Sequence, residues 1–257
     1  MNQIGIKDIM SKAISIAKSA SVTEALDKML AEGADPLIVT QNGSVIGTVS
    51  RKSIAEIMGS RRNSNLSPNA IHVATTVEDD FTSAYPDQGI DVAIPLLQRY
   101  KLVVVLDREH RLLGQVTTGD MLKVVKPQVA VEEMLEPAHS ILADERVVHL
   151  RRRMLDEGIS KFIVKDNSGI IGIVTETDVA TAMRSFREVV EDKYQDHRIR
   201  NMIVRDIMSA PVLTMEVSTG IEAMVDTMLK KGISSIPVTR NGVIEGLVTR
   251  HSVIQAL

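Results

Sequence analysis

Cysteine and tryptophan are both absent from this chain of 257 residues, and aromatic residues make up only 2% of it. Without cysteine the chain can form no disulfide, no thiolate metal site and no cysteine nucleophile. A core must then be built from aliphatic side chains and the 13 methionines, and a hydrophobic content of 44% is enough for one. The length allows one large domain or two ordinary ones.

Long apolar runs and a strong excess of charge are also missing. No run approaches the length of a membrane span, and the N-terminus lacks the basic-then-apolar layout of a signal peptide. A net charge of −3 argues against a general attraction to nucleic acid or to an anionic membrane. The basic clusters at 61–62 and 151–153 lack interleaved aromatic residues, which favours solvated faces over a nucleic-acid track. We therefore expect a soluble cytoplasmic protein.

One short motif is present four times. It reads Gly-x-Val-Thr-x-x-Asp in the copy at 172–178: the end of a strand, a hydroxyl residue at a helix start, and a carboxylate three residues later. The other copies begin at Gly47, Gly114 and Gly246, and fourteen positions before the four copies lie Gly33, Tyr100, Gly158 and Gly232. Four copies with a constant internal spacing indicate a repeat protein.

Repeat one shows which elements each unit contains. A short apolar segment precedes Ser21, which with Glu24 forms a capping box at the start of an amphipathic helix that ends at Gly33. The β-rich runs 36–40 and 45–50 are joined by a Gln-Asn-Gly turn, which predicts a hairpin. A second helix follows. The sequence thus predicts an α/β protein whose repeats each contain a strand, a helix, a hairpin and a helix.

Repeat two and the connectors depart from this pattern. Pro95 lies inside the predicted helix of repeat two and Tyr100 stands where glycine is expected, so this copy is degenerate. Residues 59–68 are polar and rich in breakers, which predicts a flexible loop. Residues 184–201 carry many charges at helical spacing and predict a mostly exposed helix.

These units resemble the cystathionine-β-synthase-type domain, the CBS domain family. The resemblance rests on Asp-Ile-Met at 8–10 and 206–208, on Glu133-Met134 at the corresponding place, on Gly-Ile-Ser-Ser-Ile-Pro-Val at 232–238 and on the strand-to-helix motif. It implies repeats at 1–58, 66–126, 127–185 and 202–257, paired through their sheets as one with two and three with four. It also implies a sensor or regulatory subunit that binds adenine nucleotides or related adenosyl ligands in clefts between paired repeats.

An adenosine site needs an acceptor for the ribose hydroxyls, donors for a phosphate and an apolar slot for the base. Asp178 and Asp120 supply a carboxylate in repeats three and two, as dinucleotide-binding folds do for ribose. Repeats one and four carry Ser53 and Ser252 there, which are short and neutral. An alternative remains open, because Thr-x-x-Asp before a helix is also an ordinary capping arrangement.

The resemblance also places basic residues at the phosphate and the first strand of repeat three at the base. The full set of candidate ligand-binding residues is Asp178, Thr175, Lys161, Ile159, His139, Ser140, Ile141, Arg250, His251, Asp120, Thr117, Arg51 and Lys52. The expected ligand is AMP, ADP, ATP or S-adenosylmethionine, and no further cofactor is expected. His139 has no second ligand at metal spacing, which argues against a metal site.

Three functions compete at this point. The leading interpretation is a non-catalytic sensor that signals to an unknown protein partner, and the sequence leaves a homodimer open. The second is a ligand-free interaction scaffold in which both aspartates only cap helices. The third is an enzyme fragment, such as the regulatory insert of an inosine monophosphate dehydrogenase. It is disfavoured because no catalytic domain and no nucleophile with a base can be found.

Overall fold

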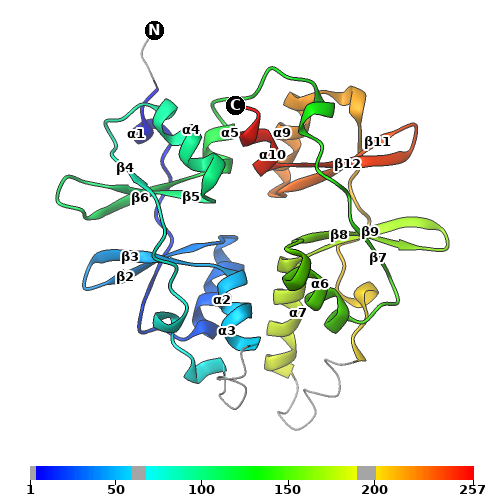
Figure 1. The fold of residues 1–257 in the computed structure, drawn as a ribbon, viewed down its shortest axis with the longest axis horizontal. Helices are drawn as coiled ribbons and strands as arrows, with labels where there is room; N and C mark the ends of the chain where they lie inside the picture. The colour runs from blue at the N-terminus through cyan, green and yellow to red at the C-terminus, as the bar shows by residue number, and fades with distance from the viewer. Residues whose placement is uncertain (1–3, 60–67, 190–200) are drawn as a thin grey trace. The chain divides into compact units, whose positions relative to one another are not determined.

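The computed structural model describes residues 4–59, 68–189 and 201–257 (Figure 1). They form two compact units. The first unit contains Met1–Glu136, Val217–Ile236 and Val248–Leu257, and the second contains Pro137–Glu216 and Pro237–Leu247. Repeat four therefore contributes to both: its residues 217–236 and 248–257 belong to the first unit, and its residues 202–216 and 237–247 belong to the second.

The first two repeats show the predicted order of elements. Repeat one contains α1 (Ile6–Ile9), β1 (Ser15–Ala17), α2 (Val22–Glu32), β2 (Leu37–Gln41), β3 (Ser44–Val49) and α3 (Arg51–Gly59). Repeat two contains the short 3₁₀ helices η2 (Pro68–Ala70) and η3 (Val73–Thr75), then β4 (Ser83–Ala84), α4 (Ile90–Arg99), β5 (Leu102–Leu106), β6 (Leu112–Thr117) and α5 (Thr118–Leu122).

The last two repeats repeat this order. Repeat three contains η4 (Val131–Met134), β7 (Ser140–Leu142), α6 (Val147–Glu157), β8 (Lys161–Asp166), β9 (Gly169–Thr175) and α7 (Glu176–Val189). Repeat four contains η5 (Val204–Asp206), β10 (Met215–Glu216), η6 (Val217–Thr219), α9 (Ile221–Lys231), β11 (Ser235–Arg240), β12 (Val243–Thr249) and α10 (Arg250–Gln255). The prediction of an α/β fold with strand-helix-hairpin-helix repeats is confirmed.

Each repeat has its own three-stranded sheet, in which the second strand is central. The first strand pairs with this central strand in parallel, as β1 does with β2 and β7 with β8, and a helix lies between the two strands in the sequence. The third strand pairs with it antiparallel through the hairpin, as in β2 with β3 and β8 with β9. A parallel pair needs a crossover connection, and the first helix of each repeat is that connection.

Local sequence signals explain where the helices begin and end. Ser21 and Glu24 form the predicted capping box of α2. Gly33 ends α2 with a φ of 62°, a left-handed conformation that glycine adopts without steric cost. The predicted helix and hairpin boundaries of repeat one agree with the structure to within one residue.

Repeat two differs from repeat three in the link between its first helix and its hairpin. Helix α4 continues through Pro95 and ends at Arg99, and Tyr100 follows it with an extended backbone. Leu102 pairs with Thr117, just as Lys161 pairs with Thr175 in repeat three. Tyr100 therefore holds the C-cap position that Gly158 holds in repeat three, as the spacing predicted. Only the link from this position to the first paired residue of the hairpin is one residue shorter.

Repeats one and two pack together through their sheets, as predicted. A buried cluster joins Ile38 of β2 to Leu102, Val104 and Leu106 of β5. Its members are fully or almost fully buried. A separate cluster inside repeat one lies between the other face of its sheet and its helices, and includes Met29 and Ile54. The sheet of repeat one is thus covered on one face by its own helices and on the other by repeat two.

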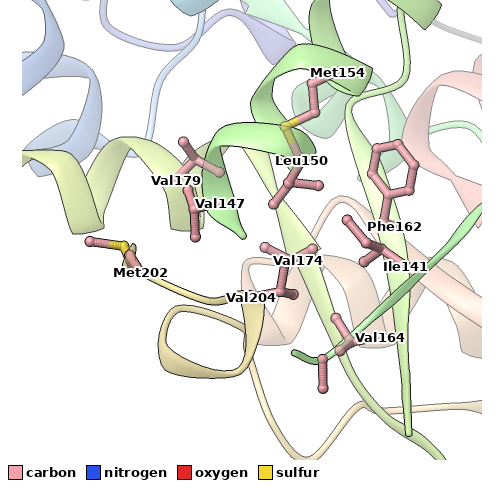
Figure 2. Close-up of a cluster of buried hydrophobic side chains, with 11 residues drawn as sticks. Ile141, Val147, Leu150, Met154, Phe162, Val164, Val174, Val179, Met202 and Val204 are labelled. Atoms are coloured by element: carbon pink, nitrogen blue, oxygen red, sulfur yellow. The ribbon is translucent and has the colours of Figure 1, made fainter. Parts of the chain in front are cut away.

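The second unit has one core around the sheet of repeat three (Figure 2). Phe162 and Val174 of the hairpin pack with Leu150 of α6, and Met202 and Val204 join them from the start of repeat four. Pairing of repeats three and four as a full module stays a prediction. Helix α7 covers 184–189 of the predicted connector helix, whereas the predictions for 190–200 and 60–67 lie outside the described residues.

Candidate ligand sites

The residues that precede the first strand of each repeat are called here its leading segment: 6–14, 71–82, 131–139 and 203–214. Two of the four leading segments contain a serine that lies beside the last strand of another repeat: Ser11 lies beside the last strand of repeat two, and Ser209 lies beside the last strand of repeat three. Ser11 and Gln115 exchange backbone hydrogen bonds of 2.8 and 3.0 Å, and Ser209 and Ile173 exchange bonds of the same lengths. These two leading segments thus extend the neighbouring sheet at the strand that ends in the recurring motif.

The glycine that opens the motif is required by this close approach. A Cβ atom on Gly172 would lie 2.9 Å from the carbonyl oxygen of Ser209 and 2.8 Å from the sulfur of Met208. On Gly114 it would lie 2.8 Å from the carbonyl oxygen of Ser11. These distances are shorter than van der Waals contact, so any larger residue would push the leading segment away.

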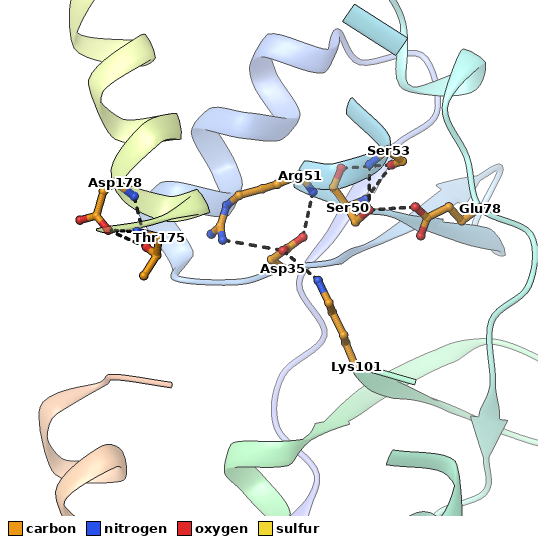
Figure 3. A network of polar contacts seen from close by, with 8 residues as sticks. All are labelled: Asp35, Ser50, Arg51, Ser53, Glu78, Lys101, Thr175 and Asp178. Carbon is orange, nitrogen blue, oxygen red and sulfur yellow. Dashed lines mark hydrogen bonds and ion pairs between the residues drawn. The ribbon is translucent and has the colours of Figure 1, made fainter. Parts of the chain in front are cut away.

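Asp178 lies at the start of α7, and the residue is partly exposed. Its Oδ2 accepts hydrogen bonds from the backbone N–H and the hydroxyl of Thr175, at 2.7 and 2.6 Å (Figure 3). Its Oδ1 accepts a bond of 2.8 Å from the Ser209 hydroxyl. A carboxylate accepts about four hydrogen bonds, so, counting donors among the residues that the structure describes, one acceptor position on Oδ1 remains for a further donor.

Asp120 has the same place in repeat two but is saturated. Its Oδ2 accepts from the N–H and hydroxyl of Thr117 and from the hydroxyl of Ser11, and its Oδ1 forms an ion pair of 3.0 Å with Lys123. Only 6% of the residue is exposed. Burial acts to raise the pKa of Asp120, but the bonds from Thr117, Lys123 and Ser11 outweigh it and lower the pKa. A ligand could reach this carboxylate only by displacing one of those partners.

Other predicted residues of repeat three lie on or next to the strands of the same sheet. Lys161 lies directly opposite Thr175 in the β8–β9 ladder. His139 and Ser140 are exposed at the start of β7. Ile141, by contrast, is 3% exposed within the core. Its side chain therefore faces the core, and Ile159 packs partly against the same cluster.

Arg51 of repeat one is held by an acidic residue that the sequence analysis did not consider. Its backbone N–H donates to Oδ1 of Asp35 at 3.0 Å, and its guanidinium lies 3.7 Å from Oδ2 (Figure 3). Lys101 adds a second cation 3.4 Å from Oδ2 of the same aspartate. Lys52 is exposed on α3. The charge of Arg51 is thus largely compensated within the protein.

Arg250 of repeat four is in the first unit, and its guanidinium is mostly buried there. Its Nη2 donates to the carbonyl of Met228 at 3.0 Å, and its buried Nε has no hydrogen-bond partner among the described residues. Its Nη1 fits against Gly119, where a Cβ atom would lie only 3.0 Å away. Burial lowers the pKa of Arg250, and the negative charge of Asp120 opposes this effect. His251 is exposed one residue later.

Two carboxylates that the sequence analysis missed complete the pattern. The hydroxyl of Ser50 donates to Oε1 of Glu78 at 2.8 Å, and the hydroxyl of Thr249 donates to Oε1 of Glu136 at 2.8 Å. Both glutamates belong to leading segments, where repeats one and four carry Ser11 and Ser209. The repeats without a motif aspartate therefore receive a carboxylate from another repeat. The available signal was an acidic residue shortly before a first strand: Glu136 lies four positions before Ser140, and Glu78 lies five positions before Ser83.

Metal-binding clusters and membrane-spanning helices are both absent from the described residues. These residues contain no group of three or more acidic, histidine or cysteine side chains that would suit a metal ion. Of the helices in the ranges 4–59, 68–189 and 201–257, none combines the length and the apolar character needed to cross a bilayer.

The chain was compared with known families and sequences. The family model described as "CBS domain" matches residues 6–60, 73–127, 129–185 and 204–257. Uncharacterized protein MK0525 from Methanopyrus kandleri is 34% identical over 113 residues, which are 43% of this chain and 53% of that protein. MJ1404 from Methanocaldococcus jannaschii is 21% identical over 97% of this chain and 61% of its own length. The chain thus spans only about half to three fifths of these two relatives.

Solved structures with the same fold cover the whole chain. The crystal structure of MJ1225 from Methanocaldococcus jannaschii, described as a candidate archaeal homologue of g-AMPK, aligns with a TM-score of 0.82 at 19% identity, over 98% of this chain and 99% of that one. A conserved protein from Pyrococcus horikoshii aligns with a TM-score of 0.64 at 20% identity and the same coverage. At such identities the likeness shows a shared fold.

Proposed function

Because the chain belongs to the CBS domain family, whose members are typically regulatory, we propose that it is a non-catalytic sensor of an adenosine nucleotide or a related adenosyl ligand. The proposed site is centred on Asp178 in the second unit. The observation that carries the proposal is that Asp178 is partly exposed and keeps an acceptor position on Oδ1, whereas Asp120 is saturated.

Ribose recognition is the role that suits Asp178. A carboxylate that accepts hydrogen bonds from vicinal hydroxyls is a common device for binding ribose. One hydroxyl can use the remaining position on Oδ1, and the other can replace the Ser209 hydroxyl or share Oδ1 with it. Thr175 holds Oδ2 from two directions, so the carboxylate is preorganised for this contact.

Contacts to the rest of the ligand follow from the neighbouring strands. Lys161 lies opposite Thr175 and is the cation of this unit that we assign to a phosphate. His139 and Ser140 are exposed at the start of β7, where they suit the polar edge of a base, and Ile159 adds apolar surface. Arg250 or His251 was predicted to face the same phosphate; both residues belong to the first unit, and their contact with the ligand stays a prediction.

The likeness to MJ1225 supports a nucleotide-sensing role, since that protein is described as a candidate homologue of g-AMPK. A sensor must convert binding into a structural change. At Asp178 the ligand would compete with Ser209, which belongs to the leading segment of repeat four. We therefore expect ligand binding to alter that segment and to be read by a protein partner, in the cytoplasm.

A thermal-shift panel of AMP, ADP, ATP, S-adenosylmethionine and NAD tests the proposal. A ligand at 100 times its dissociation constant should stabilise the protein by about 2.7 kcal/mol. Asp178→Asn should weaken binding by about 10- to 100-fold, because a hydrogen bond to a charged acceptor contributes about 1.5–3 kcal/mol. Asp156→Asn is the matched control, since this exposed aspartate of α6 undergoes the same change of charge.

The alternative function is a ligand-free scaffold, and the capping bonds of Thr175 and Asp178 favour it. In a scaffold Asp178→Asn would lower the thermal stability without affecting any ligand. If this variant bound the ligand as tightly as the Asp156→Asn control did, Asp178 would be only a helix cap, and the proposed site would have to be abandoned.

A further inference from the structure

Asp35 lies at a position of the repeat that can be compared among all four copies. It stands two residues before the strand residue that pairs with the motif valine. The hairpin register puts Lys101 at this position in repeat two and Ser160 in repeat three. The spacing from the helix-ending glycine assigns it to Ser234 in repeat four. The position therefore carries an acid in repeat one, a base in repeat two and a neutral residue in the other two repeats.

The first N–H of the helix that follows the motif shows what this position does. In repeat three, Glu176 donates this N–H to the main-chain carbonyl of Ser160 at 3.2 Å. In repeat four, the first N–H of α10 donates in the same way to the carbonyl of Ser234 at 3.0 Å. In repeat one, the N–H of Arg51 donates instead to the side chain of Asp35, at 3.0 Å from Oδ1. A carboxylate thus replaces a carbonyl oxygen at the start of α3 and adds a negative charge there.

This carboxylate is surrounded by positive charge. Its Oδ2 lies 3.7 Å from Nη1 of Arg51 and 3.4 Å from Nζ of Lys101 (Figure 3). The side chains of Arg51 and Asp35 are only 13% and 11% exposed, so solvent ions screen their contact little. The N–H groups and the dipole at the start of a helix also favour an anion. Two cations and a helix start are the groups with which proteins bind a phosphate.

We propose that the start of α3 is an anion site that the chain fills with its own carboxylate. Asp35 takes the place of an anionic ligand, and through Lys101 it holds repeat two against repeat one without any ligand. All three residues of this contact, Arg51 included, belong to the first unit. The contact between repeats one and two is therefore permanent and does not respond to a dissolved anion. This inference is independent of the proposed function, which concerns Asp178 in the second unit.

Asp35 occupies the site more effectively than a dissolved anion. It lies between α2 and β2, and residues of both elements are packed in the core of repeat one, so its carboxylate is held beside Arg51. A dissolved phosphate would lose translational freedom on binding and would first have to displace this carboxylate. Free phosphate should therefore leave the wild-type contact intact.

Asp35→Ser is the decisive variant, because serine is the residue that repeats three and four carry at this position. It removes the carboxylate and keeps both Arg51 and Lys101. Without phosphate the variant should melt below the wild type, since a mostly buried guanidinium loses a carboxylate. Inorganic phosphate should then bind, and at 100 times its dissociation constant it should raise the Tm by about 5–10 °C. The wild type should show no such rise at equal phosphate concentration and ionic strength.

Three controls identify the cause of a phosphate response. Lys101→Ser breaks the same ion pair but keeps the carboxylate, so it should gain no phosphate binding. Asp35→Asn removes the charge but keeps an amide of similar size beside the cations, so it should bind phosphate about tenfold more weakly than Asp35→Ser. Asp87→Ser breaks the exposed ion pair with Arg108 and should leave the phosphate response of the wild type unchanged. All titrations are made in an Asp178→Asn background, which removes the proposed site of the second unit from the measurement.

Two results would overturn the inference. The first is an Asp35→Ser protein that keeps the wild-type Tm and gains no phosphate response. The second is a Lys101→Ser protein, with Asp178 intact, that binds AMP more weakly than the wild type, because the first unit would then bind ligand through Lys101. If Asp35→Ser does not fold alone, phosphate present during refolding should restore the native circular dichroism spectrum, and failure to do so also contradicts the inference. Neither result affects the proposed function, which depends on the loss of AMP binding by Asp178→Asn.

Discussion

Ser209 donates a hydrogen bond of 2.8 Å to Asp178, which lies 31 residues earlier in the chain. Ser11 does the same to Asp120 at 3.0 Å, across 109 residues. In both cases the serine follows an Asp-Ile-Met sequence, and the aspartate caps a helix of another repeat. The aspartate that was predicted to contact ligand is therefore also the point at which one repeat contacts the next.

Ser209→Ala should tighten binding of the ligand at Asp178, because it frees an acceptor position on Oδ1 that the serine now occupies. The same change should lower the free energy of unfolding by about 0.5–1.5 kcal/mol, the usual contribution of one hydrogen bond. Ser11→Ala is the matched variant in the first unit: it should cost similar stability and leave binding at Asp178 unchanged. Weaker binding by Ser209→Ala in calorimetry would mean that Ser209 supports the ligand instead of competing with it.

Gly172→Ala should destabilise the second unit by about 1–3 kcal/mol, the range for forcing extra atoms into a packed site. The added methyl group would meet the Ser209 carbonyl and the Met208 sulfur at less than contact distance. Gly5→Ala is a suitable control, because the nearest atom to its Cβ would be 3.4 Å away. Urea denaturation of both variants measures the difference. Equal stabilities would show that the leading segment can move aside at little cost.

Asp120→Asn should lower stability near neutral pH by about 1–3 kcal/mol, because a buried acceptor loses its charge among several donors. The pKa of Asp120 is lower in the folded protein than in the unfolded chain. Its contribution to stability is therefore present above the unfolded pKa and is lost as the pH falls through the folded value. The difference between wild type and variant should shrink from pH 7 toward pH 3 in urea titrations. A difference that stays constant over this range would contradict the role given to the charge.

Much of the fold was predictable because its signals are local. The capping box at Ser21, the left-handed glycine at Gly33 and the hairpin turn each act within a few residues, and each was confirmed. Repeat two was the exception, since its shorter link between α4 and β5 cannot be read from a spacing taken from the other copies.

The candidate sites were less predictable because their partners come from distant parts of the chain. The motif identified Asp178 and Thr175, and the ladder adds Lys161. Neither Glu136 at Thr249 nor Asp35 at Arg51 shares a motif with its partner, and only the tertiary fold brings them together. The motif proposed a ribose carboxylate at both Asp120 and Asp178, and it could not predict that Asp120 is buried and paired with Lys123.

Repeats one and two each extend the sheet of the other with their own leading segment, and this limits where the chain can be divided into fragments that fold. Ser11 is bonded to the last strand of repeat two, and Glu78 is bonded to the last strand of repeat one. If the chain were cut between repeats one and two, each fragment would keep a sheet whose last strand lacks its partner. It would also keep a leading segment whose binding strand is in the other fragment. Duplication or truncation in this lineage should therefore proceed by pairs, and a gene fragment that encodes one repeat alone should yield a protein that dimerises or aggregates.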